Sequence, residues 1–253
     1  MLAAFEFGTT CDDVRAIVVT GAGDTFSHGT DLRAPDGFSA GSGAFKPLRG
    51  GRRDVGGELA VAIYRSTRPV IAAINGTAVG IGVSMVLPMD IRVCSATSRF
   101  AVPFVRRGIV PESCSTWFLP RIVGISTAMY WATTGKTFTA DEALAQGLVQ
   151  EVVPQEDVLS RAMEIASGIA SHSAPIAVAL TRQMMWRGLS VDHPMTANEL
   201  ESEALLHLGA LPDAREGVQS FLERRAPIFP TPASQTPAPY PWWVEPEFQA
   251  PES

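Results

Sequence analysis

The sequence predicts an α/β fold, for three reasons. Short runs rich in valine and isoleucine alternate with stretches of helical periodicity in the first half of the chain. These apolar runs are continuous, which is typical of parallel strands covered on both faces. The second half is mostly helical by the same criteria. With 253 residues, 46% hydrophobic and 18% charged, the chain has enough material for a sizeable core.

Four runs are predicted as strands. Each carries several β-branched residues, which favour the extended backbone. The first two end at a glycine, which favours a turn directly after the strand. The four runs are residues 15–21, 69–76, 91–94 and 148–153.

Helices are predicted from caps and periodicity. Thr139 and Glu142 form a capping box that opens a short helix ending at Gly147. Pro175 stands where a helix through residue 186 should begin, and Asp213 is expected to cap a last helix. Another helix is predicted from apolar residues at helical spacing: Val158, Ala162, Ile165 and Ile169.

Two segments are predicted to lack regular structure. Residues 34–57 carry seven glycines and few large apolar side chains. The tail from Ala226 onward holds eight of the nineteen prolines. Aromatic residues in this tail predict that it lies on a protein surface, namely Trp242, Trp243 and Phe248.

Charge and cysteine content exclude several classes of function. The net charge is −6, and the densest basic cluster (Lys46, Arg49, Arg52, Arg53) suits an isolated phosphate group, not a nucleic-acid duplex. The three cysteines form no CxxC pair that would indicate a zinc ribbon or disulfide framework. The sequence shows neither a signal-peptide pattern nor a membrane-spanning run, so we expect a cytoplasmic protein without a nucleic-acid or membrane partner.

Two glycine turns are candidate functional elements. "VVTGAGDTFSHGTDL" follows a strand, but Phe26 stands where a dinucleotide fingerprint needs its third glycine. The Gly29–Thr30 step and the turn at residues 80–82 each follow a predicted buried strand. Two interpretations stay open: backbone N–H groups that form an oxyanion hole, or glycines that only permit tight turns and close packing.

Glu112 is the one charged residue in the apolar stretch "IVPESCSTWFLP". A helix predicted over residues 113–123 offers a structural interpretation, because a carboxylate near a helix N-terminus is stabilised by about 0.3–1 kcal/mol. The alternative is a catalytic carboxylate. Without further information both interpretations stay open.

Five blocks resemble those of the crotonase (enoyl-CoA hydratase/isomerase) superfamily in order and spacing. They are "RAIVVTGAGDTFSHGTDL", "RPVIAAINGTAVGIGVSMVLPMDIRV", "GIVPESCSTWFLPRIVG", "TGKTFTADEALAQGLVQEVVP" and "DAREGVQSFLERR", within residues 12–229. The resemblance implies a ββα spiral core, a helical C-terminal region that builds trimers or dimers of trimers, and coenzyme A thioester substrates. It implies no metal or redox cofactor.

The resemblance also implies roles for single residues. The oxyanion hole would be the backbone N–H groups of Thr30 and Ile81. Typical hydratases carry glutamates at the positions of Ser84 and Phe104, and their absence here puts simple hydration in doubt. "VGIGVSM" and "PESCS" resemble more closely the peroxisomal-type 3-enoyl-CoA to 2-enoyl-CoA isomerases, in which a lone glutamate matches Glu112.

A lone carboxylate suits isomerisation, because the same group can take a proton from C2 and return it to C4. Two alternatives remain: a 2-enoyl-CoA hydratase that uses Glu112 with an unidentified partner, and a catalytically silent acyl-CoA-binding protein. Ser113 departs from the related motif, which usually has glycine there. The resemblance further implies substrate or coenzyme A contacts by Arg33, Phe104, Phe221 and Arg225.

Three units are expected along the chain: a crotonase-like core over residues 1–188, a helical C-terminal region over 189–229 and a proline-rich tail over 230–253. Relatives open with two strands before the helix in which this sequence begins. We therefore expect the N-terminal hairpin to be missing.

Overall fold

The main sheet of the protein is parallel. In the computed structural model, which describes residues 1–31, 45–48 and 51–236, its strand order is β1-β4-β6-β9. All three strand pairs are parallel, with Ile17 opposite Val70 and Ile71 opposite Ile91. The four predicted strands and their parallel arrangement are confirmed. The strands are β1 (Ile17–Thr20), β4 (Val70–Ile74), β6 (Ile91–Ser95) and β9 (Glu151–Val153).

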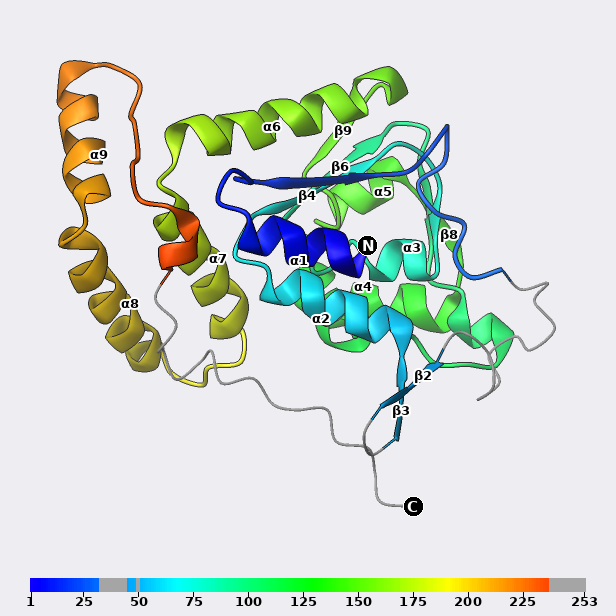
Figure 1. Ribbon diagram of the computed structural model, residues 1–253. Helices are drawn as coiled ribbons and strands as arrows, with labels where there is room; N and C mark the ends of the chain where they lie inside the picture. The colour runs from blue at the N-terminus through cyan, green and yellow to red at the C-terminus, as the bar shows by residue number, and fades with distance from the viewer. Residues whose placement is uncertain (32–44, 49–50, 237–253) are drawn as a thin grey trace.

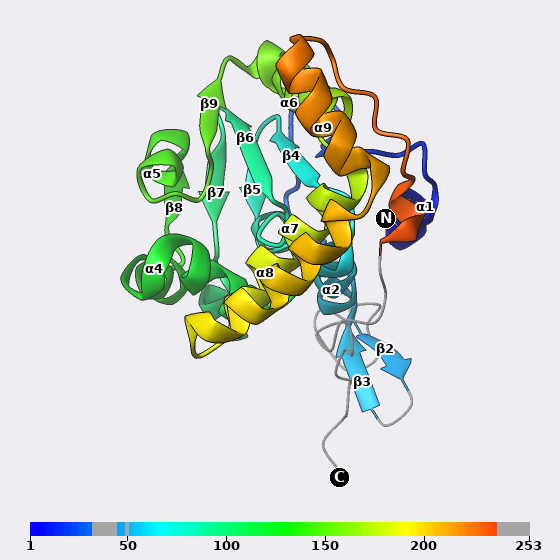
Figure 2. The same cartoon turned by 90° about the vertical axis from the view of Figure 1, so that its left-hand side faces the viewer.

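Two smaller sheets accompany it. One contains β5 (Ala78–Val79), β7 (Arg99–Ala101) and β8 (Thr137–Thr139), in which β7 pairs parallel with β5 and antiparallel with β8. The other is an antiparallel hairpin of β2 (Phe45–Leu48) and β3 (Gly51–Asp54), which extends below the core in Figures 1 and 2.

The hairpin corrects one expectation. Regular structure was not predicted for residues 34–57, yet β2 and β3 form there and a helix begins at Val55. The local reason is Asp54, whose side chain accepts a hydrogen bond from the backbone N–H of Gly57 and so caps this helix despite its two glycines.

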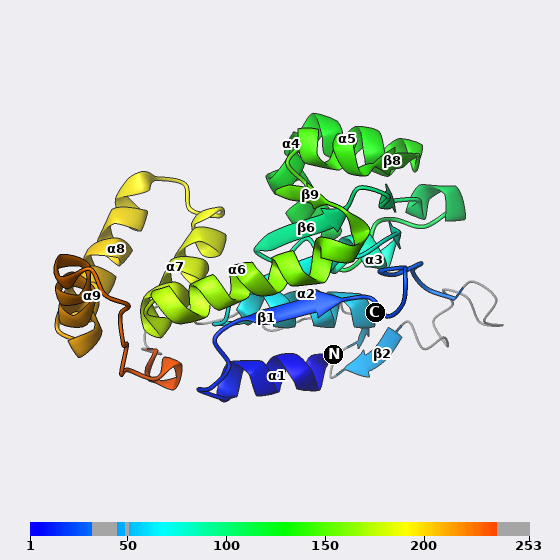
Figure 3. The same cartoon turned by 90° about the horizontal axis from the view of Figure 1, so that it is seen from above.

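The helices surround the sheets and dominate the second half of the chain. One of them, α6, packs against β1, β4 and β6 and covers one face of the main sheet (Figure 3). The helices are α1 (Leu2–Thr10), α2 (Val55–Arg65), α3 (Ile81–Ser84), α4 (Ser115–Thr134), α5 (Ala140–Ala145), α6 (Val158–His172), α7 (Pro175–Gly188), α8 (Pro194–Gly209) and α9 (Pro212–Glu223). Short 3₁₀ turns add η1 (Phe104–Arg107), η2 (Gln155–Asp157) and η3 (Ala233–Gln235).

The predicted helix starts are confirmed at two places and wrong at a third. Thr139 and Glu142 form the reciprocal capping box of α5, and Pro175 is the first residue of α7. Asp213, in contrast, lies inside α9, which begins at Pro212. Its Oδ1 accepts hydrogen bonds from the N–H (3.1 Å) and the hydroxyl (2.8 Å) of Thr231. It therefore ties the segment after α9 to the helix instead of capping it.

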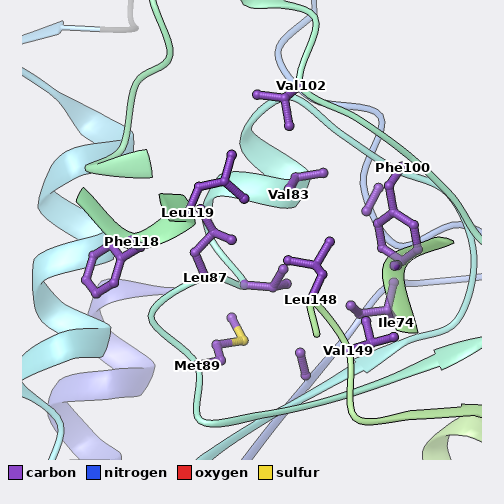
Figure 4. Packing of buried hydrophobic residues seen from close by; sticks show 14 of the residues in the cluster. Ile74, Val83, Leu87, Met89, Phe100, Val102, Phe118, Leu119, Leu148 and Val149 are labelled. Atoms are coloured by element: carbon purple, nitrogen blue, oxygen red, sulfur yellow. The ribbon is translucent and has the colours of Figure 1, made fainter. Parts of the chain in front are cut away.

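The largest hydrophobic cluster lies on the face of the main sheet that α6 does not cover. It joins side chains of β4, α3, β7 and α4, part of which Figure 4 shows around Val83, Leu87 and Leu119. All five residues of β4 are buried. Aromatic rings extend the cluster, with Phe138 stacked on Trp131 at a centroid distance of 3.7 Å. This close packing holds α3 and the start of α4 in fixed positions.

The C-terminal helices form a separate group. Ile176, Leu180 and Ala204 make a small cluster between α7 and α8, and α9 continues along the same side of the molecule (Figures 1 and 2). Residues beyond α9 return to the other end of the chain, because the N–H and hydroxyl of Ser234 donate to Asp12. Trp242, Trp243 and Phe248 fall outside the described residues. The division into three units stays a prediction.

Within residues 1–31, 45–48 and 51–236, no helix combines the length and apolarity needed to cross a membrane.

A buried ion pair links the C-terminal helices to the main sheet. Asp90, just before β6, accepts hydrogen bonds from the Val70 N–H and from Arg182 Nε, both at 2.7 Å, and from Trp186 Nε1 at 2.7 Å. The guanidinium group of Arg182 is buried and also donates to backbone carbonyl oxygens, including that of Ser66. Asp90 thus neutralises a cation whose side chain is only 4% exposed to water.

Replacing Asp90 by alanine should lower the free energy of unfolding by about 3–5 kcal/mol, because a buried arginine would lose its counter-ion. Urea unfolding followed by circular dichroism measures the change. The matched control is Glu164→Ala, which removes an exposed partner of Arg161 and should cost less than about 1 kcal/mol. Equal unfolding midpoints for the two variants would contradict the importance of the buried pair.

Candidate active site

Two backbone segments lie side by side at the predicted oxyanion turns. Ser27 pairs with Ala78 in an isolated parallel bridge. Gly29 has a φ of +91°, and a Cβ there would lie 2.9 Å from the Val79 carbonyl oxygen. A Cβ on Gly82 would lie 2.7 Å from the Ser27 carbonyl oxygen. Glycine is therefore required at both places by close backbone approach, as the structural interpretation of these turns expects.

The same approach brings Thr30 and Ile81 to one region. Gly80 has a φ of +59°, and Ile81 is the first residue of α3, where backbone N–H groups have no partner within the helix. Among the described residues, neither the Thr30 nor the Ile81 N–H donates a hydrogen bond to a protein acceptor. Within the described residues, the packing and the oxyanion interpretations of these turns are therefore compatible.

The main chain at Glu112 is firmly held. Helix α4 begins at Ser115, not at residue 113, so Glu112 precedes the helix. Its carbonyl oxygen accepts hydrogen bonds from the Ser115 N–H at 3.0 Å and from the Ser115 hydroxyl. The first turn of α4 contains no acidic residue, which argues against the helix-dipole interpretation of Glu112.

Ser113 and Cys114 adopt a conformation that favours glycine. Both have a φ of +57°, in the left-handed region. A non-glycine residue held there costs on the order of 1–3 kcal/mol. Ser113 therefore adopts a backbone conformation that glycine would adopt without this cost.

The carboxylate of Glu112 lies against the first turn of α2. A Cβ on Gly56 would lie 1.9 Å from Ser113 Oγ, 2.4 Å from Glu112 Oε2 and 3.0 Å from Ile81 Cδ1. These three side chains, from two separate segments, therefore meet beside Gly56, and only glycine leaves room for them. Ser113 Oγ donates a short hydrogen bond to Glu112 Oε2.

The pKa of Glu112 differs from that of a glutamate in water. Burial raises the pKa of its carboxyl group, the hydrogen bond from Ser113 opposes this effect, and the negative charge of Asp54 adds to it. Oε1 is enclosed and has no hydrogen-bond partner within the described part of the chain. Burial also raises the pKa of the neighbouring Cys114 thiol, which disfavours a reactive thiolate.

Asp54 is a site residue that the sequence analysis missed. Its Oδ2 accepts the Gly57 N–H at 2.5 Å and the Ser113 N–H at 3.1 Å. One oxygen thus caps α2 and fixes the turn that carries Glu112. An aspartate ahead of Val55 and two glycines is an N-cap signal, but nothing in the sequence connects it with Ser113.

The two positions where hydratases carry glutamates are close to the Gly80 turn. The Ser84 side chain is buried, and its Oγ donates to the Gly80 carbonyl oxygen at 3.3 Å. Phe104 is buried as well, and its Cζ would lie 3.9 Å from a Cβ on Gly80. A hydroxyl bound to the backbone and an apolar ring thus stand at these two places.

The remaining predicted contacts are not brought to Glu112 in a single chain. Phe221 is 81% exposed on α9, which lies at the opposite end of the molecule from α3 (Figures 1 and 3). Arg225 binds both oxygens of Glu216, at 2.6 and 2.9 Å. Arg33 lies outside the described residues. The substrate roles of these residues stay predictions.

No group of three or more His, Cys, Asp or Glu side chains in the described ranges could hold a metal ion.

Comparison with known proteins identifies the class. The family model described as enoyl-CoA hydratase/isomerase matches residues 1–232. The chain belongs to this family, and its α/β architecture is the crotonase fold. It is accordingly an enoyl-CoA hydratase or isomerase, as the sequence resemblance predicted.

Single relatives agree with this assignment. The enoyl-CoA hydratase ACTT3 of Alternaria alternata is 43% identical over 86% of this chain and 71% of its own length. The short-chain-enoyl-CoA hydratase of Clostridium acetobutylicum is 36% identical over 84% of this chain and 79% of its own. A crystal structure of a probable enoyl-CoA hydratase/isomerase from Mycobacterium abscessus superposes with a TM-score of 0.80 and 32% identity, covering 90% of this chain and 85% of that one.

Gly56→Ala should displace the Glu112 carboxylate and lower turnover of an enoyl-CoA thioester about a hundredfold, since a misplacement of about 1 Å has this effect on catalysis. Steady-state kinetics measures the loss. The matched control is Gly168→Ala on the exposed face of α6, where a Cβ meets nothing within 4 Å. The control should keep full turnover and gain about 0.5–1 kcal/mol of stability. Full turnover in Gly56→Ala would contradict the described packing.

The raised pKa of Glu112 also predicts a pH-dependent stability. The folded chain binds the Glu112 proton at higher pH than the unfolded chain, so stability falls as pH rises from about 4.3 through the folded-state pKa. Glu112→Gln should therefore be more stable than the wild type at pH 7, and the difference should shrink as pH falls. Urea unfolding at a series of pH values measures it.

Glu151→Gln is a control for which we expect the opposite change in stability. The hydrogen-bonded Arg161 lowers the pKa of Glu151, so this variant should be less stable than the wild type at pH 7, with the difference lost in acid. A Glu112→Gln variant that behaves like Glu151→Gln would contradict the burial of Glu112.

Proposed function

We propose that this protein is an enoyl-CoA isomerase that moves a double bond from C3 to C2 of an enoyl-CoA thioester, with Glu112 as its single proton carrier. One observation carries the proposal. Glu112 is a half-buried carboxylate whose Oε1 lacks a partner within the described chain. The positions of the hydratase glutamates hold Ser84 and Phe104 instead.

A single carboxylate can carry out both proton transfers of this reaction. The Glu112 carboxylate takes a proton from C2, and the C2–H electron pair moves toward the thioester oxygen to give a dienolate. The Thr30 and Ile81 N–H groups would stabilise the negative charge on that oxygen. When the carbonyl re-forms, a double bond forms between C2 and C3, and C4 takes the proton back from Glu112. Neither water nor a redox or metal cofactor is consumed.

The surroundings of Glu112 support this role. A carboxyl group that both takes and returns a proton works best when its pKa approaches the working pH, and burial shifts the pKa of Glu112 in that direction. The enclosed Oε1 of this half-buried carboxylate also suits a reaction that needs no bound water. Ile81 and Phe104 add apolar surface beside the Gly80 turn.

A second candidate is 2-enoyl-CoA hydration, because the relatives from Alternaria alternata and Clostridium acetobutylicum are named hydratases. Hydration needs a held water and a second proton carrier. Asp54 is a carboxylate next to the Glu112 turn, but its Oδ2 accepts two backbone N–H groups. This oxygen is therefore engaged in holding the backbone, which argues against a role as the second proton carrier. The structure therefore favours isomerisation.

The proposal extends to assembly. Exposed apolar residues on α8 and α9 fit contacts between copies in a homotrimer or a dimer of trimers: Leu205, Leu206, Phe221 and Leu222. In such an assembly, Phe221 and Arg225 would reach the acyl-CoA site of a neighbouring subunit.

Glu112→Gln should lower turnover of a 3-enoyl-CoA by about 10²–10⁴-fold, because an amide cannot carry the proton. The assay follows the ultraviolet absorbance of the conjugated thioester over 2-enoyl- and 3-enoyl-CoA substrates of graded length. Glu164→Gln, at an exposed carboxylate, is the control and should keep full activity.

Three outcomes would reject isomerisation. Undiminished turnover by Glu112→Gln would remove Glu112 from the mechanism. Loss of conjugation from 2-enoyl-CoA, without conversion of any 3-enoyl-CoA, would establish hydration. Tight acyl-CoA binding in calorimetry without turnover of either class would establish the silent binding protein.

A further inference from the structure

The turn that carries Glu112 contains a hydroxyl group in an unusual place. Ser113 is only 1% exposed and has a φ of +57°, a conformation that costs free energy for any residue except glycine. A glycine would adopt this turn without that cost. The serine side chain adds one interaction that glycine cannot make, the hydrogen bond from Oγ to Glu112 Oε2.

Ser113 is itself fixed from a separate element. Its N–H donates to Asp54 Oδ2 at 3.1 Å, and the same oxygen caps α2 through the Gly57 N–H. The absent Cβ of Gly56 leaves the space that Ser113 Oγ and Glu112 Oε2 occupy. The hydroxyl therefore has a defined position relative to α2 and is not a freely rotating surface group.

We propose that Ser113 is a positioning residue for the reaction: its hydroxyl holds Oε2 of Glu112 and thereby fixes the orientation of the carboxylate that takes and returns the substrate proton. This inference rests on the proposed function, in which Glu112 is the proton carrier. Among the described residues the Ser113 hydroxyl is the side-chain group that holds the carboxylate through Oε2, whereas Oε1 is enclosed and has no hydrogen-bond partner there.

The hydroxyl also acts on the charge of Glu112. Burial and the negative charge of Asp54 raise the pKa of Glu112, and the Ser113 hydrogen bond lowers it. Uncharged groups of the described residues also lie near the carboxylate: Ile81 from α3, the Gly56 backbone from α2, and the Cys114 thiol, whose own pKa is raised. The positive charge of Arg53 lowers the pKa of Cys114, so this cation also lies near the turn. The hydroxyl thus opposes the effect of burial and favours the ionised form of the carboxylate.

The test compares Ser113→Gly and Ser113→Ala with the wild type. The glycine variant removes the hydroxyl and relieves the left-handed backbone, so it should fold at least as stably. In ¹³C NMR of glutamate-labelled protein, the Glu112 signal is assigned by its absence in Glu112→Gln. We expect this signal to titrate at higher pH in both serine variants.

The same variants should lose about tenfold or more in kcat with little change in KM, as expected for a hydrogen bond to a charged group. The acidic limb of their kcat/KM profile should move to higher pH. Ser115→Ala is the matched control, since its hydroxyl binds the Glu112 carbonyl oxygen and not the carboxylate. It should leave the titration of Glu112 in place.

Two results would overturn the inference. One is an unchanged Glu112 titration in Ser113→Gly and Ser113→Ala. The other is wild-type kcat and pH profile in Ser113→Gly, which a purely structural serine would give. Glu112→Gln tests the proposed function separately: if that variant is inactive while Ser113→Gly behaves as the wild type, only the role of Ser113 fails.

Discussion

The site depends on the contact between the first turn of α2 and the turn that precedes α4. Asp54 joins them, because one of its carboxylate oxygens accepts N–H groups from Gly57 and from Ser113. Gly56 permits the approach, since any side chain there would overlap Ser113 Oγ. At this contact the Glu112 carboxylate and the Ile81 side chain both lie next to Gly56.

Glu112 shows how opposing effects set the properties of a single acid. Burial and the charge of Asp54 disfavour its ionised form, while the Ser113 hydroxyl favours it. The net effect raises the pKa of Glu112, and a raised pKa favours a carboxyl group that both takes and returns a proton. This arrangement lowers the stability of the folded chain, because a half-buried carboxylate and two non-glycine residues with positive φ each cost free energy.

The rest of the fold provides rigidity at a distance. The apolar cluster between the main sheet and α4 fixes α3 and the start of α4. The buried pair of Asp90 and Arg182 attaches α7 to the same sheet. The helices α8 and α9 stand apart from Glu112, with Phe221 and Leu222 exposed to solvent in the single chain. This separation leaves the region of Glu112 independent of their packing within one subunit.

The sequence by itself determined the parallel strands, the capping box at Thr139, the helix start at Pro175 and the family, because these depend on local patterns and on motifs in order. It also singled out Glu112 as a carboxylate in an apolar stretch. It missed the β2–β3 hairpin, because a glycine-rich segment carries little apolar pattern, and it misjudged Asp213, whose partner Thr231 lies far along the chain. Only the tertiary structure brought Asp54 and Gly56 to Ser113, since long-range contacts between small and polar groups leave no periodic signal in a sequence.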